Sequence, residues 1–181
     1  VRGGGPDQNL VVMDGVEIHN PFRLAGALSA FNAEIIERFD FVSAVFPPGY
    51  GDRLSSLLLI ETRDGPRDEP LAGTAGLGLV DTNVTLAGRL PRRWPGAWIV
   101  AGRRTYYDLL AERFTGSDLP GFSDLFAKLS LEPRPGAQLA LSTLVGGESA
   151  DMSFAYPSFG KEQAGTLAST NRLAIASLRW R

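Results

Sequence analysis

The feature that most constrains this chain is a repeated two-residue alternation of apolar and polar side chains between residue 71 and the C-terminus. Successive side chains of a β-strand point to opposite faces, so such alternation predicts two-faced strands. In 82–90 one face carries Val84, Leu86, Gly88 and Leu90, and the other carries Asn83, Thr85, Ala87 and Arg89. The same reading predicts six strands, at 71–80, 82–90, 97–107, 122–132, 137–147 and 165–181.

Two of these strands contain an apolar residue that breaks the alternation. In 122–132, Leu125, Ala127, Leu129 and Leu131 share a face, but Phe126 lies on the polar side with Asp124, Lys128, Ser130 and Glu132. In 137–146, Leu144 is likewise out of step with Leu139, Leu141 and Val145. In 97–107, Arg103 and Arg104 are adjacent, so one of them must face the apolar side or lie at its edge.

Two settings produce strands of this kind. In a soluble sandwich the apolar faces of two sheets meet, whereas in an outer-membrane barrel they meet lipid and the polar faces line the interior. The connections at 91–96 and 133–136 are tight and rich in proline and glycine, while those at 108–121 and 148–162 are long. Short turns at one end, long loops at the other, and aromatic residues near strand ends favour the membrane barrel. The aromatic residues concerned are Trp94, Trp98, Trp180, Tyr106, Tyr107 and Phe122.

The residues before 66 predict a small α+β unit. The sequence 10–20 contains two short apolar segments around Asp14-Gly15, a pair that favours a tight hairpin turn. Asn32 is a suitable N-cap for a short helix over 33–38, and strands are expected at 40–46 and 57–63.

Composition excludes several classes of function. The chain has 18 basic and 20 acidic residues, interspersed, with a net charge of about −2, which predicts no nucleic-acid partner. It has no cysteine and one histidine, so we predict no metal site, and no residues imply a cofactor. No set of nucleophile, base and orienting group can be assembled, so an enzyme is not expected. A carboxylate dyad would require two of Asp14, Glu17, Asp40 and Asp52 to converge.

The order of motifs resembles a known family. The segments RGGGPDQNLVVMDGVEIHNPF and FNAEIIERFDFVSAVFPPGYGDRLSSLLLIETRDG look like the plug domain of TonB-dependent outer-membrane receptors. The segments TLAGRLP and GRRTYYD, which follow, resemble the first barrel strands of that family. The resemblance covers essentially the whole chain. It implies the C-terminal part of a plug domain at 1–68 and the N-terminal strands of a transmembrane barrel at 69–181, both as a fragment of a longer receptor.

This resemblance implies a fold and a function. The fold is an α+β plug followed by about six antiparallel strands of an incomplete membrane β-barrel of about 22 strands, whose lumen the plug blocks. In such an arrangement we expect the two halves to share no single core. The implied function is import of a scarce or large extracellular ligand across the outer membrane, energised by the TonB complex of the inner membrane. The outer-membrane lipid is the remaining partner.

The resemblance also assigns residues. The apical plug loops that face the ligand would contain Arg2, His19, Asn20, Pro48 and Tyr50. Contacts between plug and barrel wall would involve Arg53, Glu61 and Arg63, because a plug that moves should be held by polar contacts. Siderophore, cobalamin, glycan and peptide ligands remain open. A soluble β-rich binding or adhesion module also remains open, since it would explain the alternation although not the first third of the chain.

Overall fold

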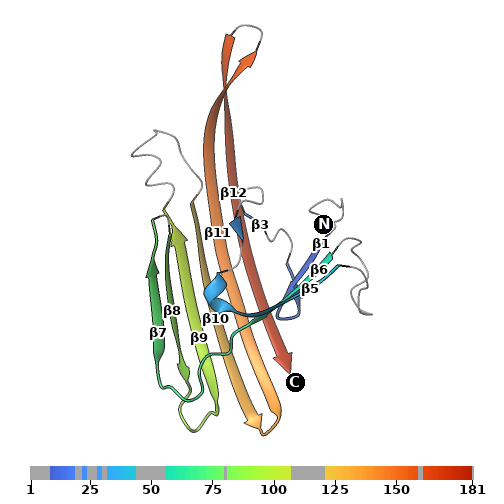
Figure 1. The fold of residues 1–181 in the computed structure, drawn as a ribbon, viewed down its shortest axis with the longest axis vertical. Coiled ribbons are helices and arrows are strands. Elements are labelled where there is room, and N and C mark those ends of the chain that lie inside the picture. The colour runs from blue at the N-terminus through green and yellow to red at the C-terminus, as the bar shows by residue number, and fades with distance from the viewer. Residues whose placement is uncertain are drawn as a thin grey trace.

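The structure, a computed structural model, describes residues 9–18, 22–23, 28–29, 32–43, 56–79, 81–106, 121–158 and 161–180. This part of the chain is mostly β-sheet (Figure 1). It forms a six-stranded sheet, a four-stranded sheet and a two-stranded sheet of β3 (Phe22–Arg23) and β4 (Leu28–Ser29).

The six-stranded sheet confirms the six strands predicted from the alternation. Its order is β12-β11-β10-β9-β8-β7, with every neighbouring pair antiparallel. The strands are β7 (Ala72–Leu77), β8 (Asp81–Arg89), β9 (Gly96–Thr105), β10 (Gly121–Arg134), β11 (Ala137–Ser158) and β12 (Lys161–Trp180). The tight turns at 91–96 and 133–136 are confirmed as well, and Gly136 has the positive φ of 82° that such a turn requires.

One predicted loop is wrong. Residues 148–162 were expected to form a long connection, but β11 and β12 stay paired from Ser149↔Thr170 to Ser158↔Lys161. The physical reason is that a continued ladder satisfies the backbone groups of both segments, which an irregular loop would leave to water. This hairpin extends well beyond the other strands (Figure 1). The other long connection, at 108–121, lies almost entirely outside the described residues.

The four-stranded sheet has the order β2-β1-β6-β5 and contains β1 (Asn9–Met13), β2 (Val16–Glu17), β5 (Ile36–Val42) and β6 (Ser56–Thr62). The predicted hairpin is confirmed: β1 and β2 pair antiparallel around Asp14 and Gly15, whose φ angles are 48° and 87°. The strand predicted at 57–63 is β6. It pairs in parallel with β1, from Asn9↔Ser56 to Met13↔Ile60.

The helix predicted at 33–38 is wrong in length. Asn32 does act as the cap, since its side chain accepts a hydrogen bond of 3.1 Å from the backbone N–H of Glu34. Only Ala33–Ile35 is helical, as a 3-10 turn, and Ile36–Val42 is strand β5. The β-branched and aromatic residues of this segment suit a strand, and the edge of β6 offers them a partner. The described residues contain no helix long and apolar enough to cross a membrane.

The two larger sheets share a hydrophobic core, so the expectation of no common core is wrong. Phe126 and Leu144, the residues that break the alternation, are fully buried and face the four-stranded sheet. Their position explains the exceptions, because the inward face needs apolar side chains where the smaller sheet covers it. The core contains Val11, Met13, Ile18, Ile35 and Ile60 from the first part of the chain and Ala87, Ile99, Ala101, Phe126, Leu144 and Ile175 from the large sheet.

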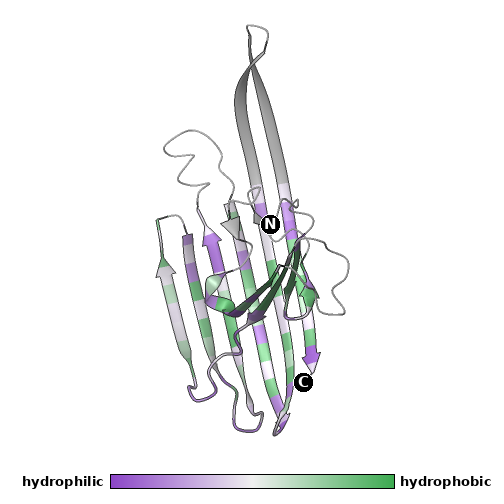
Figure 2. Cartoon of the chain, turned by 45° about the vertical axis from the view of Figure 1, so that its right-hand side comes forward, coloured by the Kyte–Doolittle hydropathy of each residue, from purple (hydrophilic) through white to green (hydrophobic). Residues whose placement is uncertain are grey.

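The opposite face of the six-stranded sheet, which we call the outer face, is apolar and exposed. Figure 2 shows hydrophobic and hydrophilic residues alternating along its strands. The exposed large side chains are Val84, Leu86, Val100, Leu125, Leu129, Leu141, Val145, Leu178 and Trp180. The strand register places them in rows across neighbouring strands, as in Val84–Gly102–Leu125–Val145–Ala174. The sheet thus buries its mixed polar face and exposes its apolar one.

Candidate functional site

The buried polar groups between the two larger sheets gather around Lys128. This lysine lies on the inward face of β10 and is only 3% exposed. Its Nζ donates to the backbone O of Thr62 at 2.7 Å and to Thr62 Oγ1 at 3.0 Å, and it lies 2.7 Å from Oδ1 of Asp64. An ammonium group has three donors. The three partners of Lys128 therefore all lie at the end of β6 or in the segment that follows it.

Asp14 reaches the same place through the β1–β6 pairing. The parallel register puts Met13 beside Ile60, so the turn after β1 lies against the end of β6. Oδ1 of Asp14 accepts from the backbone N–H of Thr62 at 3.1 Å, and its Oδ2 accepts from the Thr62 hydroxyl. Its carboxylate is also 3.9 Å from Lys128 Nζ and 3.9 Å from Nη1 of Arg179 on β12. One turn residue thus meets two cations of the large sheet.

Asp64 lies in the segment that leads from the four-stranded sheet to the six-stranded sheet, and it contacts the inward face of the latter. Besides Lys128, Ser130 Oγ donates to its Oδ1 at 2.9 Å, and Gln138 Nε2 donates to its Oδ2. Partial burial alone would raise the pKa of Asp64, but the hydrogen bond and charge of Lys128, with the bonds from Ser130 and Gln138, outweigh burial and hold the pKa below its usual value. Asp64 is therefore an anion in this setting.

We call the group Asp14, Thr62, Asp64, Lys128, Ser130, Gln138 and Arg179 the interface network. It contains two carboxylates and two cations, so its formal charge is balanced. A second polar contact lies on the same face nearer the other end of the sheet: Arg103 Nη2 is 2.8 Å from Oδ2 of Asp124, and its guanidinium lies 4.7 Å from the centre of the Phe122 ring. Arg103 faces inward and Arg104 is exposed, which settles the ambiguity of that strand.

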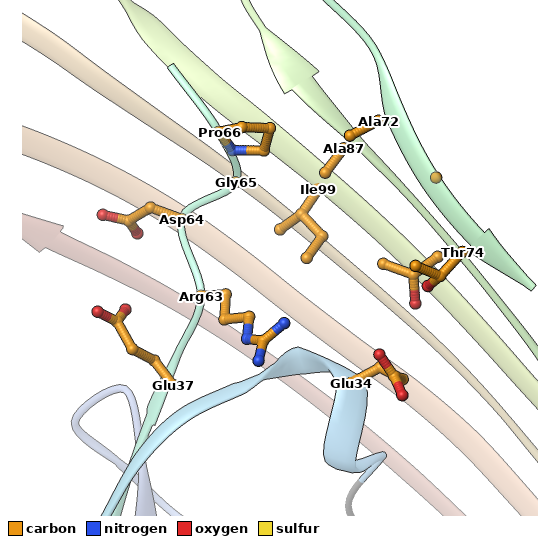
Figure 3. Close-up of a pocket in the computed structure, with 12 residues that line it drawn as sticks. Glu34, Glu37, Arg63, Asp64, Gly65, Pro66, Ala72, Thr74, Ala87 and Ile99 are labelled. Carbon is orange, nitrogen blue, oxygen red and sulfur yellow. The ribbon is translucent and has the colours of Figure 1, made fainter. Parts of the chain in front are cut away.

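A cavity of about 490 Å³ opens beside the interface network (Figure 3). Glu34, Glu37 and Arg63 come from one side, and the facing wall consists of small or apolar residues of β7, β8 and β9. The hydroxyl of Thr85, which is 8% exposed, belongs to this lining and has no hydrogen-bond partner among the described residues. The space separates the 3-10 turn from the large sheet, and Asp64 lies at its boundary with the network.

Two of the predicted site residues are described. Glu61 lies 3.4 Å from Arg38, so this ion pair stays within the four-stranded sheet. Arg63 Nε donates to the backbone O of Ile36 at 3.1 Å, and the exposed Arg63 side chain lines the cavity. Arg2, His19, Asn20, Pro48, Tyr50 and Arg53 lie outside the described residues. Of the four acids considered for a dyad, Asp14 meets Lys128 and Arg179, and Asp40 pairs with Arg38 at 3.0 Å. Glu17 is exposed on β2, and Asp52 is not described.

The interface network was not predicted from the sequence. Lys128 was visible as a charge on the polar face of its strand, and Asp14 and Asp64 each precede a glycine at a turn. The missing signal was the parallel pairing of β1 with β6, which no local pattern reveals. Within the described residues no group of three or more His, Cys, Asp and Glu side chains could hold a metal ion.

Comparison of the chain with protein-family models, with curated proteins and with solved structures finds no match in any of the three.

Proposed function

We propose that this chain forms the inner plug and first wall strands of a TonB-dependent outer-membrane receptor, which imports a scarce or large extracellular ligand. The ordered plug-like motifs of the sequence suggest the family. The observation that carries the proposal is the outer face, where large apolar side chains from Val84 to Trp180 point away from the smaller sheet. Apolar surface in water costs roughly 25 cal/mol per Å², so an exposed face of this size calls for an apolar environment.

Strand length supports the same environment. A tilted strand needs about 9 to 11 residues to cross a membrane. Strands β8 to β12 have 9, 10, 14, 22 and 20 residues. In this proposal the outer face contacts lipid, and the polar inward face lines a lumen that the four-stranded sheet occupies.

The interface network then has a mechanical role. It attaches the smaller sheet to the wall through hydrogen bonds and ion pairs around Lys128 and Asp64, next to an open cavity. Water can replace these polar bonds when the sheet moves, whereas the apolar contacts around Phe126 would have to be exposed to water. In the proposed import cycle, energy from the TonB complex displaces the smaller sheet, and the cavity beside Arg63 leaves open space next to the attachment.

A soluble β-rich binding or adhesion module is the second candidate. The shared core around Phe126 favours it, because two sheets packed face to face around one core also describe a soluble sandwich. A soluble module of this kind, however, would leave the apolar side chains of the outer face exposed to water.

Fractionation of cells that produce the natural protein tests the proposal. We expect the protein in the outer-membrane fraction, extractable only with detergent. Uptake of a panel comprising a ferric siderophore, cobalamin, an oligosaccharide and a peptide is then measured with and without TonB. Recovery in the aqueous fraction would favour the soluble module. Recovery in the membrane with TonB-independent uptake would retain the location and reject the energised import.

A further inference from the structure

A row of polar residues crosses the outer face directly beyond its apolar rows. The register aligns Arg104 of β9, Ser123 of β10, Gly147 of β11 and Arg172 of β12. Arg104, Ser123 and Arg172 are exposed, whereas Thr105 and Phe122, their neighbours along the strands, are buried on the inward face. The row lies toward the end of the sheet opposite the two tight turns, where hydrophilic residues gather in Figure 2.

This row forms part of a hollow of about 370 Å³. Gly121 and Gly147 belong to its lining, and a Cβ added at Gly147 would have only the backbone O of Asn171 within 4 Å, at 3.9 Å. Three residues that carry a hydroxyl, Ser123, Ser149 and Thr170, also belong to its lining. Arg104 and Arg172 stand on either side, three strand spacings or about 14 Å apart at the backbone.

Among the described residues that line the hollow, positive charge exceeds negative charge. Neither Arg104 nor Arg172 forms an ion pair or side-chain hydrogen bond with the residues that the structure describes. Glu148 also belongs to the lining, but it alternates with the outward-facing Gly147 and makes an interaction of its own. Two guanidinium groups that have no ion pair among the described residues, with hydroxyl-bearing residues between them, suit a phosphate group, which arginine binds through paired charge-assisted hydrogen bonds.

The rows below the hollow indicate where the rest of the ligand lies. Leu125 and Val145 are each two residues from Ser123 and Gly147, in the next row toward the tight turns, and both are at least half exposed. A molecule that placed a phosphate in the hollow and an acyl chain over these side chains would satisfy both surfaces. A free phosphate ion would leave the apolar rows uncovered.

We propose that Arg104 and Arg172 bind the phosphate-bearing headgroup of an anionic membrane lipid, with its acyl chains on the apolar rows around Leu125 and Val145. This inference rests on the proposed function, because the outer face must contact lipid for the headgroup to reach the hollow. The site would hold the β9–β12 part of the six-stranded sheet at a fixed depth in the membrane. It is separate from the interface network, which lies on the inward face.

The test uses the natural protein, solubilised in detergent and observed by native mass spectrometry. Phosphatidic acid, which carries a bare phosphate, is titrated in parallel with phosphatidylcholine, whose phosphate is covered by choline, and with inorganic phosphate. We expect tighter binding of phosphatidic acid than of the other two. Arg104→Ala and Arg172→Ala should each weaken that binding about tenfold, since each removes a charge-assisted contact.

Two further variants keep the result interpretable. Gly147→Trp fills the hollow while both arginines remain, so it should abolish the preference for phosphatidic acid. The matched control, Arg92→Ala with Arg93→Ala, removes two exposed arginines at the opposite end and should bind as the natural protein does. A double variant of Arg104 and Arg172 that keeps full preference would overturn the inference, and so would equal binding of inorganic phosphate. A protein recovered without any membrane association would instead defeat the proposed function.

Discussion

Nζ of Lys128, in the middle of the large sheet, lies 2.7 Å from Oδ1 of Asp64, in the segment that leaves the smaller sheet. This pair joins the two halves of the chain at the point where the backbone passes from one to the other. Because Lys128 has almost no exposure, its ammonium group is held by these partners rather than by water.

Replacing Lys128 with methionine should destabilise the protein by about 3 to 5 kcal/mol, because Asp64 and Asp14 lose the cation between them. Hydrogen exchange should rise first in β1 and β6, whose ends the lysine holds. The matched control is Arg134→Met, which removes an exposed cation from the same strand and should change stability by about 0.5 kcal/mol or less. If both variants changed the stability equally, the claim that Lys128 joins the two sheets would be contradicted.

The pKa of Asp64 predicts how stability depends on pH. A carboxyl whose pKa is lowered by folding stabilises the protein above its unfolded pKa of about 3.9, and this contribution is lost as pH falls through the lower folded value. Asp64→Asn should therefore be less stable than the natural protein at pH 7, and the difference should shrink below about pH 4. Denaturant titrations at pH 7, 4 and 3 measure it. A difference that stays constant with pH would contradict the assignment.

The shared core predicts a contrast between two neighbouring residues of β10. Phe126 is fully buried, so Phe126→Ala should cost about 3 to 5 kcal/mol and loosen the contact between the sheets. Leu125 is 55% exposed on the outer face, and Leu125→Ala should have a much smaller effect on the same contact. The rate at which a protease cleaves the smaller sheet measures how far that contact is loosened. Similar cleavage of both variants would mean that Phe126 does not join the sheets.

Lipid contact predicts a solvent-dependent effect at Leu141, which is 51% exposed. Leu141→Arg should cost about 2 to 4 kcal/mol in a bilayer if the residue lies near its midplane. On a water-facing surface the same change should stay within about 0.5 kcal/mol. Unfolding from vesicles, with Leu141→Ala as the size control, separates the two environments.

The sequence predicted the large sheet well because its information is local. Alternation located all six strands, and the Asp14-Gly15 pair located a hairpin. Prediction from the sequence was wrong where pairing between distant segments decides the structure. The edge of β6 turned the expected helix after Ile35 into a strand, and mutual pairing extended β11 and β12 through an expected loop.

The same limit explains the candidate site. Lys128 and Asp64 are far apart in the sequence, and Asp14 joins them only through parallel pairing of β1 with β6. Phe126 and Leu144 were seen as irregularities, but the smaller sheet that gives them a partner could not be placed from their own strands. Glu61 and Arg63 came from a resemblance, and the structure places them at an ion pair within one sheet and at a cavity wall.

The environment of the outer face is the most direct test of the account. The chain has no cysteine, so Leu125→Cys, Leu141→Cys and, in the exposed turn region, Arg134→Cys each provide one site for a spin label. Collision with oxygen, which concentrates in lipid, is compared with collision with a water-soluble nickel complex in the natural membrane. We predict that labels at 125 and 141 meet oxygen and are shielded from nickel, with the reverse at 134. Free access of nickel to 125 and 141 would contradict the lipid-facing wall and the receptor proposed from it.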